Sequence, residues 1–218
     1  MKQLLQDLRS HQVLVEEVPP PSCLPEGVLV KSAASLISSG TERATMTLGS
    51  KSLLGKALER PDLVRQLLRR LNTTGVVDVI ATVRSRLNST LALGYSSAGV
   101  VLEVGSGVNE FAVGDPVACA GVDHASHAEM NWVPKNLCVK IPPNVNFDSA
   151  ASVALGAIAL QGVRISEAKL GERVAVIGLG LVGQLVAQIL HAGGCVVWGL
   201  DPDPRARDGI VPCMEGWT

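Results

Sequence analysis

Aromatic side chains are scarce in this chain of 218 residues: two Phe, one Tyr and three Trp make up 3% of it. So few aromatics argue against a surface on which nucleic-acid bases stack. Neither sign of charge is in excess, because 19 basic and 20 acidic residues give a formal net charge of −1. We therefore expect no binding to nucleic acid or to an anionic membrane. The core must be built from Val, Leu, Ile and Ala, and the length allows one large or two modest domains.

The cysteines follow no pattern, and we expect no signal peptide. The five cysteines are widely scattered, and no two have C-x-x-C spacing. An odd, unpatterned set is typical of reduced thiols rather than of a disulfide framework. The first twelve residues are charged every few positions and contain no apolar run of the kind found in signal peptides. These features predict a cytoplasmic location.

Short β-prone runs separated by Gly and Pro dominate the first two thirds of the chain. Such runs occupy residues 13–18 and 28–35, and the pattern returns from Leu93, where residues 94–108 are interpreted as a strand pair. Many short strands with such corners predict a small, strongly curved all-β domain. Residues 43–90 interrupt it with apolar residues at helical spacing, which predicts a helical insert. Its basic residues fit a solvated helix face better than an anion site.

The composition changes near Asp148. An Ala-rich segment that follows is predicted to be helical, and the longest apolar stretch, residues 174–190, comes next. This stretch is about as long as a membrane span, but glycine and glutamine interrupt it. We therefore favour a strand, a glycine turn and a helix over a transmembrane segment.

The glycine turn has the G-x-G-x-x-G spacing of a dinucleotide-binding loop. Gly178, Gly180 and Gly183 follow a predicted strand, and Asp201 comes 18 residues after the last of them. The expected elements are a strand over 173–177, a helix over 184–192 and a strand over 195–200. Gly178 permits the tight turn, Gly180 lets a pyrophosphate approach the backbone, and Gly183 lets the helix pack closely. The helix N-terminus favours the phosphates electrostatically.

The intervening Leu179 and Val182 complete the predicted coenzyme contacts. Asp201 is placed to bind ribose hydroxyls and to repel a 2′-phosphate, so NAD(H) is preferred over NADP(H). Arg205 and Arg207 weaken that preference. The alternative is a βαβ unit that packs well and binds nothing.

Four segments in this order resemble the medium-chain dehydrogenase/reductase superfamily over nearly the whole chain. They read GVLVKSAASLISSGTE, LGYSSAGVVLEVGSGVNEFAVGDPVA, AASVALGAIALQGVRI and VAVIGLGLVGQ. The segments SGTERA, PDLVRQ and LGYSSAGVV are more closely similar to the first half of two-part oxidoreductases whose second half resembles glucose–fructose oxidoreductases. The resemblance implies an α/β chain with an all-β part. A GroES-like β-barrel domain over 1–147 carries the insert 43–90, and a Rossmann domain of doubly wound parallel type follows over 148–218.

The zinc ligands of the superfamily are missing at the matching positions. Ser39 stands at the cysteine position, Gly94-Tyr95-Ser96 at the G-H-E motif, and the third ligand position falls near Gly156. Ser, Tyr and Gly do not replace thiolate and imidazole around Zn²⁺, so no zinc is expected. His124 and His127, with Asp123, are an alternative metal site, but we favour surface or core histidines.

Hydride transfer without a metal still needs a group that binds or protonates the substrate oxygen. The resemblance places the Ser39–Glu42 loop and Tyr95 beside the nicotinamide, which makes Thr41 and Tyr95 the candidate catalytic residues. The alternatives are that Thr41 closes a turn and that Tyr95 packs at a β corner. The predicted activity is that of a zinc-independent NAD(H)-dependent oxidoreductase acting on an alcohol, a carbonyl compound or a saccharide.

The last residues follow neither a helical nor an alternating pattern, with Gly209, Pro212 and Gly216 in mixed sequence. A dinucleotide-binding fold has two βαβαβ halves. We therefore expect a C-terminally truncated, incomplete Rossmann domain with uncovered apolar surface. The competing hypothesis is a non-catalytic fragment or an interaction domain with a vestigial nucleotide loop. For the full-length form, the resemblance implies a homodimer.

Overall fold

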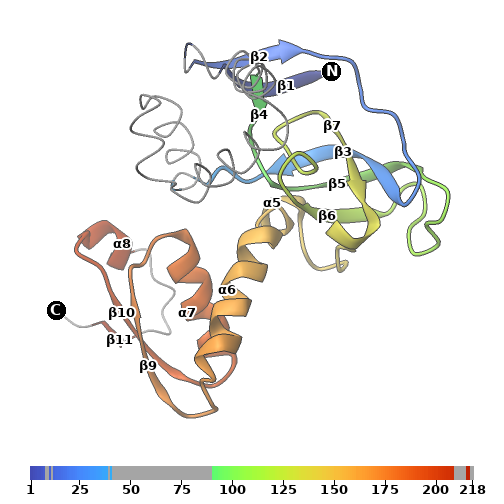
Figure 1. The fold of residues 1–218 in the computed structure, drawn as a ribbon. Helices are drawn as coiled ribbons and strands as arrows, with labels where there is room; N and C mark the ends of the chain where they lie inside the picture. The colour runs from blue at the N-terminus through green and yellow to red at the C-terminus, as the bar shows by residue number, and fades with distance from the viewer. Residues whose placement is uncertain (8–9, 11, 39, 41–89, 209–214, 217–218) are drawn as a thin grey trace, which may run out of the picture.

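The computed structural model describes residues 1–7, 10, 12–38, 40, 90–208 and 215–216. In this part of the chain, an antiparallel β body is followed by a parallel β/α segment, and a long helix runs from one to the other (Figure 1). The predicted order, a curved all-β body followed by a βαβ unit, is confirmed. The expected insert over 43–90 lies outside the described residues except for Thr90.

A five-stranded antiparallel sheet forms the centre of the β body, with the strand order β7-β3-β5-β6-β8. Its strands are β3 (Gly27–Ser35), β5 (Ser96–Val104), β6 (Pro116–Ala120), β7 (Met130–Pro134) and β8 (Cys138–Lys140). A one-turn 3-10 helix, η1 (Lys135–Leu137), connects the last two. Alternate apolar residues of these strands pack into one buried core, which includes Val28, Val30, Val101, Val117 and Val133.

The predicted strand pair over 94–108 is wrong, because residues 96–104 form the single strand β5. Gly99 lies inside this strand, opposite Ser32 of β3. A Cβ atom at this position would collide with the carbonyl oxygen of Lys31. The glycine therefore serves the close approach of β3 and β5 rather than a turn.

A smaller antiparallel sheet, with the order β2-β1-β4, covers the N-terminal end of the body. It consists of β1 (Lys2–Asp7), β2 (Val13–Glu17) and β4 (Thr90–Ala92). An isolated bridge from Gln3 to Ala128 and a hydrogen bond from the Leu4 amide to the His127 carbonyl (2.9 Å) connect it to the chain before β7.

Two helices leave the β body where one Ala-rich helix was expected. Helix α5 (Phe147–Ala150) begins after Asn146, whose side chain accepts a hydrogen bond from the Ser149 amide. Helix α6 (Val153–Ser166) follows and ends at Glu167, which is in the left-handed conformation. Figure 1 shows α6 running from the β body to the β/α segment.

The β/α segment is a parallel sheet with the order β11-β10-β9. Its elements are β9 (Arg173–Ile177), α7 (Leu181–Ala192), β10 (Val196–Leu200), α8 (Pro204–Asp208) and β11 (Glu215–Gly216). The strand over 173–177 was predicted with its correct bounds. Helix α7 begins three residues earlier than predicted, because the turn ends at Gly180. The tail also holds regular structure that the sequence did not predict, since β11 pairs with β10 in parallel.

Helix α7 packs on one face of this sheet, with α6 beside it, around a core that includes Leu179, Leu190 and Val197. Among the described residues, no helix packs on the other face: Ile177 is 85% exposed, and Val196 and Leu200 are each 40% exposed. The expected uncovered apolar surface is therefore present at this face. Within the described ranges, no helix combines the length and the hydrophobicity needed to cross a membrane.

Candidate nucleotide-binding site

The glycine turn between β9 and α7 has a conformation that requires two of its glycines. Gly178 has a φ of 89°, which L side chains rarely adopt, and its amide donates to the Leu200 carbonyl at 2.7 Å. A Cβ atom on Gly183 would collide with the Gly178 carbonyl oxygen. The first glycine therefore makes the turn, and the third lets the helix lie against it.

The middle glycine has neither constraint. Gly180 is the N-cap of α7 with φ −65° and ψ −176°, and a Cβ atom there would have no neighbour within 4 Å. No side chain caps the helix at this position. The first amide groups of a helix lack intrahelical partners, so this open space faces hydrogen-bond donors at the positive end of a twelve-residue helix. A pyrophosphate fits such an environment.

The flanking residues Leu179 and Val182 differ in exposure. Leu179 is completely buried in the core beneath the turn, whereas 37% of Val182 is exposed. The Gln184 side chain donates to the Leu179 carbonyl at 3.1 Å and so holds the turn against the first turn of α7. Val182 thus faces outward beside the open space, and Leu179 anchors the loop from below.

Asp201 lies directly after β10 and contacts the glycine turn. Its Oδ2 accepts a hydrogen bond from the Leu179 amide at 2.7 Å, and its Oδ1 accepts one from the Asp203 amide at 2.8 Å. A carboxylate has about four acceptor positions, so ribose hydroxyls can still bind here. The acidic residue therefore also fixes the turn, a role that the spacing did not reveal.

Arg205 is held by Asp203. Its Nε and one terminal nitrogen donate to the two Asp203 carboxylate oxygens at 3.2 and 3.0 Å. This bidentate pair compensates the positive charge that was expected to weaken the discrimination against a 2′-phosphate. Nothing is described of the Arg207 side chain.

Tyr95 lies half-buried in the bend before β5, and its carbonyl accepts a hydrogen bond from the Gly121 amide at 2.9 Å. The Leu36 amide donates to the Ser96 carbonyl at 3.0 Å, so the chain that leaves β3 runs beside Tyr95. Thr41, Ser39 and Glu42 lie outside the described residues. The structure therefore places Tyr95 beside the residues that directly follow β3, and the catalytic roles predicted for Tyr95 and Thr41 stay predictions.

Ser96 is a residue whose role the sequence did not suggest. It is 1% exposed, and its Oγ donates to the Ala151 carbonyl at 2.6 Å and accepts from the Ala154 amide at 3.1 Å. The hydroxyl thus supplies, from a distant strand, the side-chain cap that the N-cap Ser152 does not give to α6. It joins the bend at Tyr95 to the helix that leads to the glycine turn.

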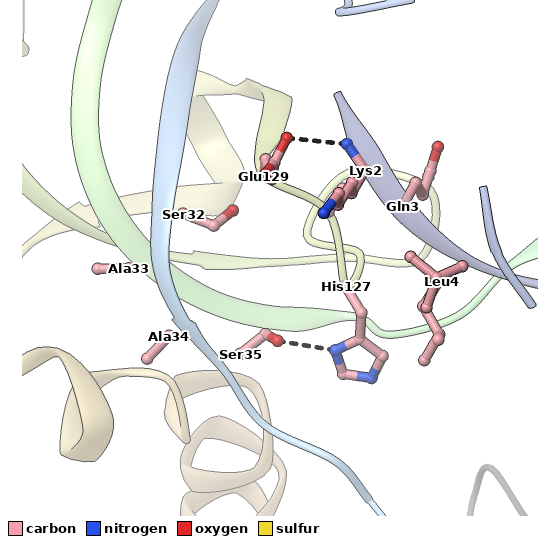
Figure 2. Close-up of a pocket in the computed structure, with 11 residues that line it drawn as sticks. Lys2, Gln3, Leu4, Ser32, Ala33, Ala34, Ser35, His127 and Glu129 are labelled. Carbon is pink, nitrogen blue, oxygen red and sulfur yellow. Dashed lines mark hydrogen bonds between the residues drawn. The ribbon is translucent and has the colours of Figure 1, made fainter. Parts of the chain in front are cut away.

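A pocket of about 340 Å³ lies between β1 and the end of β3 (Figure 2). Inside it, His127 Nδ1 is 2.8 Å from the Ser35 hydroxyl, and the Glu129 carboxylate accepts from the Lys2 amide at 2.8 Å. His124 instead lies edge-on to Trp132, with ring centroids 5.5 Å apart. The two histidines thus have separate partners, and the described residues contain no group of three side chains suited to a metal.

A second, largely apolar pocket of about 480 Å³ lies where the end of β8 meets the first turns of α6. Gly156, the position matched to the third zinc ligand, is among its lining residues, and a Cβ atom there would meet nothing within 4 Å. In Figure 1, α8 lies at the end of the parallel sheet that faces the β body. The glycine turn, which shares this end of the sheet, therefore faces the same way.

Comparisons with known proteins fit this arrangement. Residues 67–143 match the family model described as the alcohol dehydrogenase GroES-like domain. The chain is 34% identical over 129 residues to D-guloside 3-dehydrogenase of Escherichia coli K12, a match that covers 56% of this chain and 37% of that protein. The chain thus spans well under half the length of this curated relative.

Solved structures share the fold of both parts. Quinone oxidoreductase from Coxiella burnetii superposes with a TM-score of 0.70 at 22% identity, over 99% of this chain and 62% of that one. The Escherichia coli quinone oxidoreductase complexed with NADPH gives a TM-score of 0.68 at 17% identity, over 95% and 55% of the two chains. These likenesses show a GroES-like domain followed by part of a Rossmann domain.

Proposed function

We propose that the chain comes from a nicotinamide-dependent oxidoreductase of the medium-chain dehydrogenase/reductase superfamily that interconverts an alcohol and a carbonyl compound; the match to the alcohol dehydrogenase GroES-like domain and the similarity to D-guloside 3-dehydrogenase support this. When bound, the nicotinamide supplies the two-electron redox chemistry. The observation that carries the proposal is the glycine turn, where open space at Gly180 adjoins the uncapped start of α7. The name of D-guloside 3-dehydrogenase supports a saccharide as the substrate.

The residues of the turn would hold the coenzyme in defined ways. The amides at the start of α7 bind the pyrophosphate beside Gly180, and Gly178 and Gly183 keep the backbone close to it. Asp201 accepts hydrogen bonds from the ribose hydroxyls. The negative charge of Asp201 disfavours a 2′-phosphate, and Arg205 does not offset it because its guanidinium group is paired with Asp203. The proposed coenzyme is therefore NAD(H) rather than NADP(H).

The proposed chemistry at the substrate oxygen uses no zinc, since serine, tyrosine and glycine stand at the expected ligand positions. Tyr95 is proposed to donate a hydrogen bond or a proton to that oxygen from its phenol, and Thr41 to orient the substrate. Ser96 acts only by positioning, because its buried hydroxyl donates to the Ala151 carbonyl and accepts from the Ala154 amide.

A titration of the 218-residue protein with NADH tests the proposal, with NADPH in parallel. The readout is calorimetry together with energy transfer from Trp198, which lies half-buried in β10. We expect saturable binding that is tighter for NADH and is lost in Gly180→Asp, which places a side chain and a negative charge in the phosphate space.

The control is Gly162→Asp, since the exposed Gly162 of α6 also has open space at its Cβ position but belongs neither to the glycine turn nor to the pockets described above. It should bind NADH like the wild type. Absence of NADH binding in a folded sample, or equal binding by wild type and Gly180→Asp, would contradict the proposal. If binding is found, a screen of sugars and simple carbonyl compounds with Tyr95→Phe tests the catalytic part.

A further inference from the structure

Two cysteines that are far apart in the sequence face each other across neighbouring strands. Cys119 of β6 and Cys138 of β8 are register partners in an antiparallel pair, and their Sγ atoms are 3.5 Å apart. Strand β8 is the edge of the five-stranded sheet and pairs over only three residues. The cysteines are 19 positions apart in the sequence and belong to no motif, so only the strand register brings them together.

The backbone already has the spacing that a disulfide needs. Directly opposite residues of an antiparallel pair have Cα atoms about 4.5–5.5 Å apart. Disulfides occur at Cα separations of about 4.4–6.8 Å. The sulfur atoms must approach from 3.5 Å to the bond length of about 2.05 Å. Small side-chain rotations at an edge strand achieve this without moving the core.

The two thiols differ in access. Cys119 is completely buried, whereas Cys138 is only partly buried and lies at the first position of the edge strand, directly after η1. The hydrogen-bonded Cys138 sulfur and burial raise the pKa of the Cys119 thiol. A reagent from solution therefore reacts with Cys138 first, while the buried Cys119 beside it remains a protonated thiol.

We propose that Cys119 and Cys138 form a reversible oxidation site that closes to a disulfide when a hydroperoxide reaches Cys138. In the first step the Cys138 sulfur attacks the peroxide oxygen, the O–O bond breaks, and the thiol proton passes to the departing oxygen, which gives sulfenic acid and an alcohol or water. In the second step the Cys119 sulfur attacks the Cys138 sulfur, an S–S bond forms, and the S–OH oxygen leaves as water with the Cys119 proton. Two electrons pass from the two thiols to the peroxide, and an external dithiol reverses the change.

The bond would fasten the edge strand at its first residue, Cys138. The opposite end of β8 has the ion pair of Lys140 with Asp115 (2.8 Å), and the Ile141 amide donates to the Pro116 carbonyl at 2.9 Å. Beyond this end the chain continues into α5 and α6, which lead to the glycine turn. Oxidation therefore makes the support of the nucleotide segment more rigid without touching the coenzyme site.

The test treats the 218-residue protein, carrying Cys23→Ser, Cys195→Ser and Cys213→Ser, with hydrogen peroxide and then blocks the free thiols. We expect the intact mass to fall by two hydrogen atoms and peptide mapping to find Cys119 joined to Cys138. Dithiothreitol should restore both thiols. The midpoint of thermal unfolding should rise by roughly 5–10 °C in the oxidised form.

The matched control adds Cys138→Ser, which keeps a small polar side chain at the edge position. It should show no mass loss and no shift of the unfolding midpoint on oxidation. The proposal is overturned if the first protein retains two alkylatable thiols after peroxide, or if Cys138 proceeds to sulfinic acid without a Cys119 link. Mapping on the unsubstituted protein guards against a folding defect of the variants, and a Cys119–Cys138 peptide there is again the expected result.

Discussion

At the scale of single residues, Gly180 and Gly183 offer a direct comparison within one turn. A methyl group on Gly183 collides with the Gly178 carbonyl, whereas one on Gly180 enters open space. We expect Gly183→Ala to lower the free energy of unfolding by about 1–3 kcal/mol, as overpacked positions do. Gly180→Ala should leave that free energy nearly unchanged and weaken NADH binding by about tenfold. Chemical denaturation and calorimetry measure the two effects.

This pair separates packing from ligand contact. If both variants lose stability equally, the open space at Gly180 is filled in solution, and the phosphate site loses its basis. If Gly180→Ala binds NADH like the wild type, the pyrophosphate does not approach the backbone at that residue. The stability of Gly183→Ala then still reports the close helix packing.

Asp203 controls how much of the Arg205 charge is available to a ligand. The Asp203→Asn substitution removes one charged acceptor from a bidentate pair. We expect the affinity for NADPH to rise by roughly threefold to tenfold, up to about 1.4 kcal/mol, while the affinity for NADH changes little. Parallel titrations measure the ratio. An unchanged ratio would show that Arg205 does not reach the 2′-phosphate, and Arg205→Gln provides the control that should not gain NADPH affinity.

At the scale of elements, helix α6 depends on a cap that another element provides. Ser96→Ala leaves the Ala154 amide and the Ala151 carbonyl without this partner in a buried position. We expect a loss of about 1–2 kcal/mol in unfolding free energy. Ser152→Ala is the matched control, because the Ser152 hydroxyl does not cap the helix and donates to the Ser149 carbonyl at the surface. Equal losses in the two variants would contradict the capping role.

The stability of the β6–β8 pair also depends on pH. The pKa of Asp115 lies below its usual range, chiefly because the Lys140 ammonium group donates a hydrogen bond to it, and also because the Ala112 amide does. This stabilisation is fully present above the unfolded pKa of about 4 and is lost as the pH falls through the lower, folded pKa. We therefore expect acid unfolding of Asp115→Asn to depend less steeply on pH below 4. Circular dichroism between about pH 2 and 6 measures the slopes, and identical slopes would exclude this contribution.

Elements whose signal is local could be predicted from the sequence. The run from Arg173 to Ile177 and the three glycines specify strand and turn within a dozen residues, so their positions are correct. The prediction of a strand pair over 94–108 is wrong because Gly99 is required by the close Lys31 backbone of another strand and not by a turn. The Ser96 cap and the cysteine pair likewise arise from strand register, which a local pattern does not contain.

At the scale of the whole molecule, the exposed apolar face of the parallel sheet is the feature that favours self-association. Ile177 is the most exposed of its apolar residues, at 85%. We expect the 218-residue protein to self-associate through this face, and Ile177→Glu to shift it toward the monomer with little change in unfolding midpoint. Light scattering coupled to size-exclusion chromatography measures the shift. Val122→Glu, at a residue that is 64% exposed on the β body, is the control that should leave association unchanged.

The pairing of β3 with distant partners also has a consequence during synthesis on the ribosome. Strand β3 ends at Ser35, but its neighbours β5 and β7 begin at Ser96 and Met130. At roughly 5–20 residues per second, the apolar β3 emerges several seconds before its first partner and longer still before its second. Throughout that interval the nascent chain exposes an apolar strand whose pairing partners have not yet been synthesised. The antiparallel body therefore assembles late. Its yield of folded protein in a cell then depends on chaperones that bind the nascent chain.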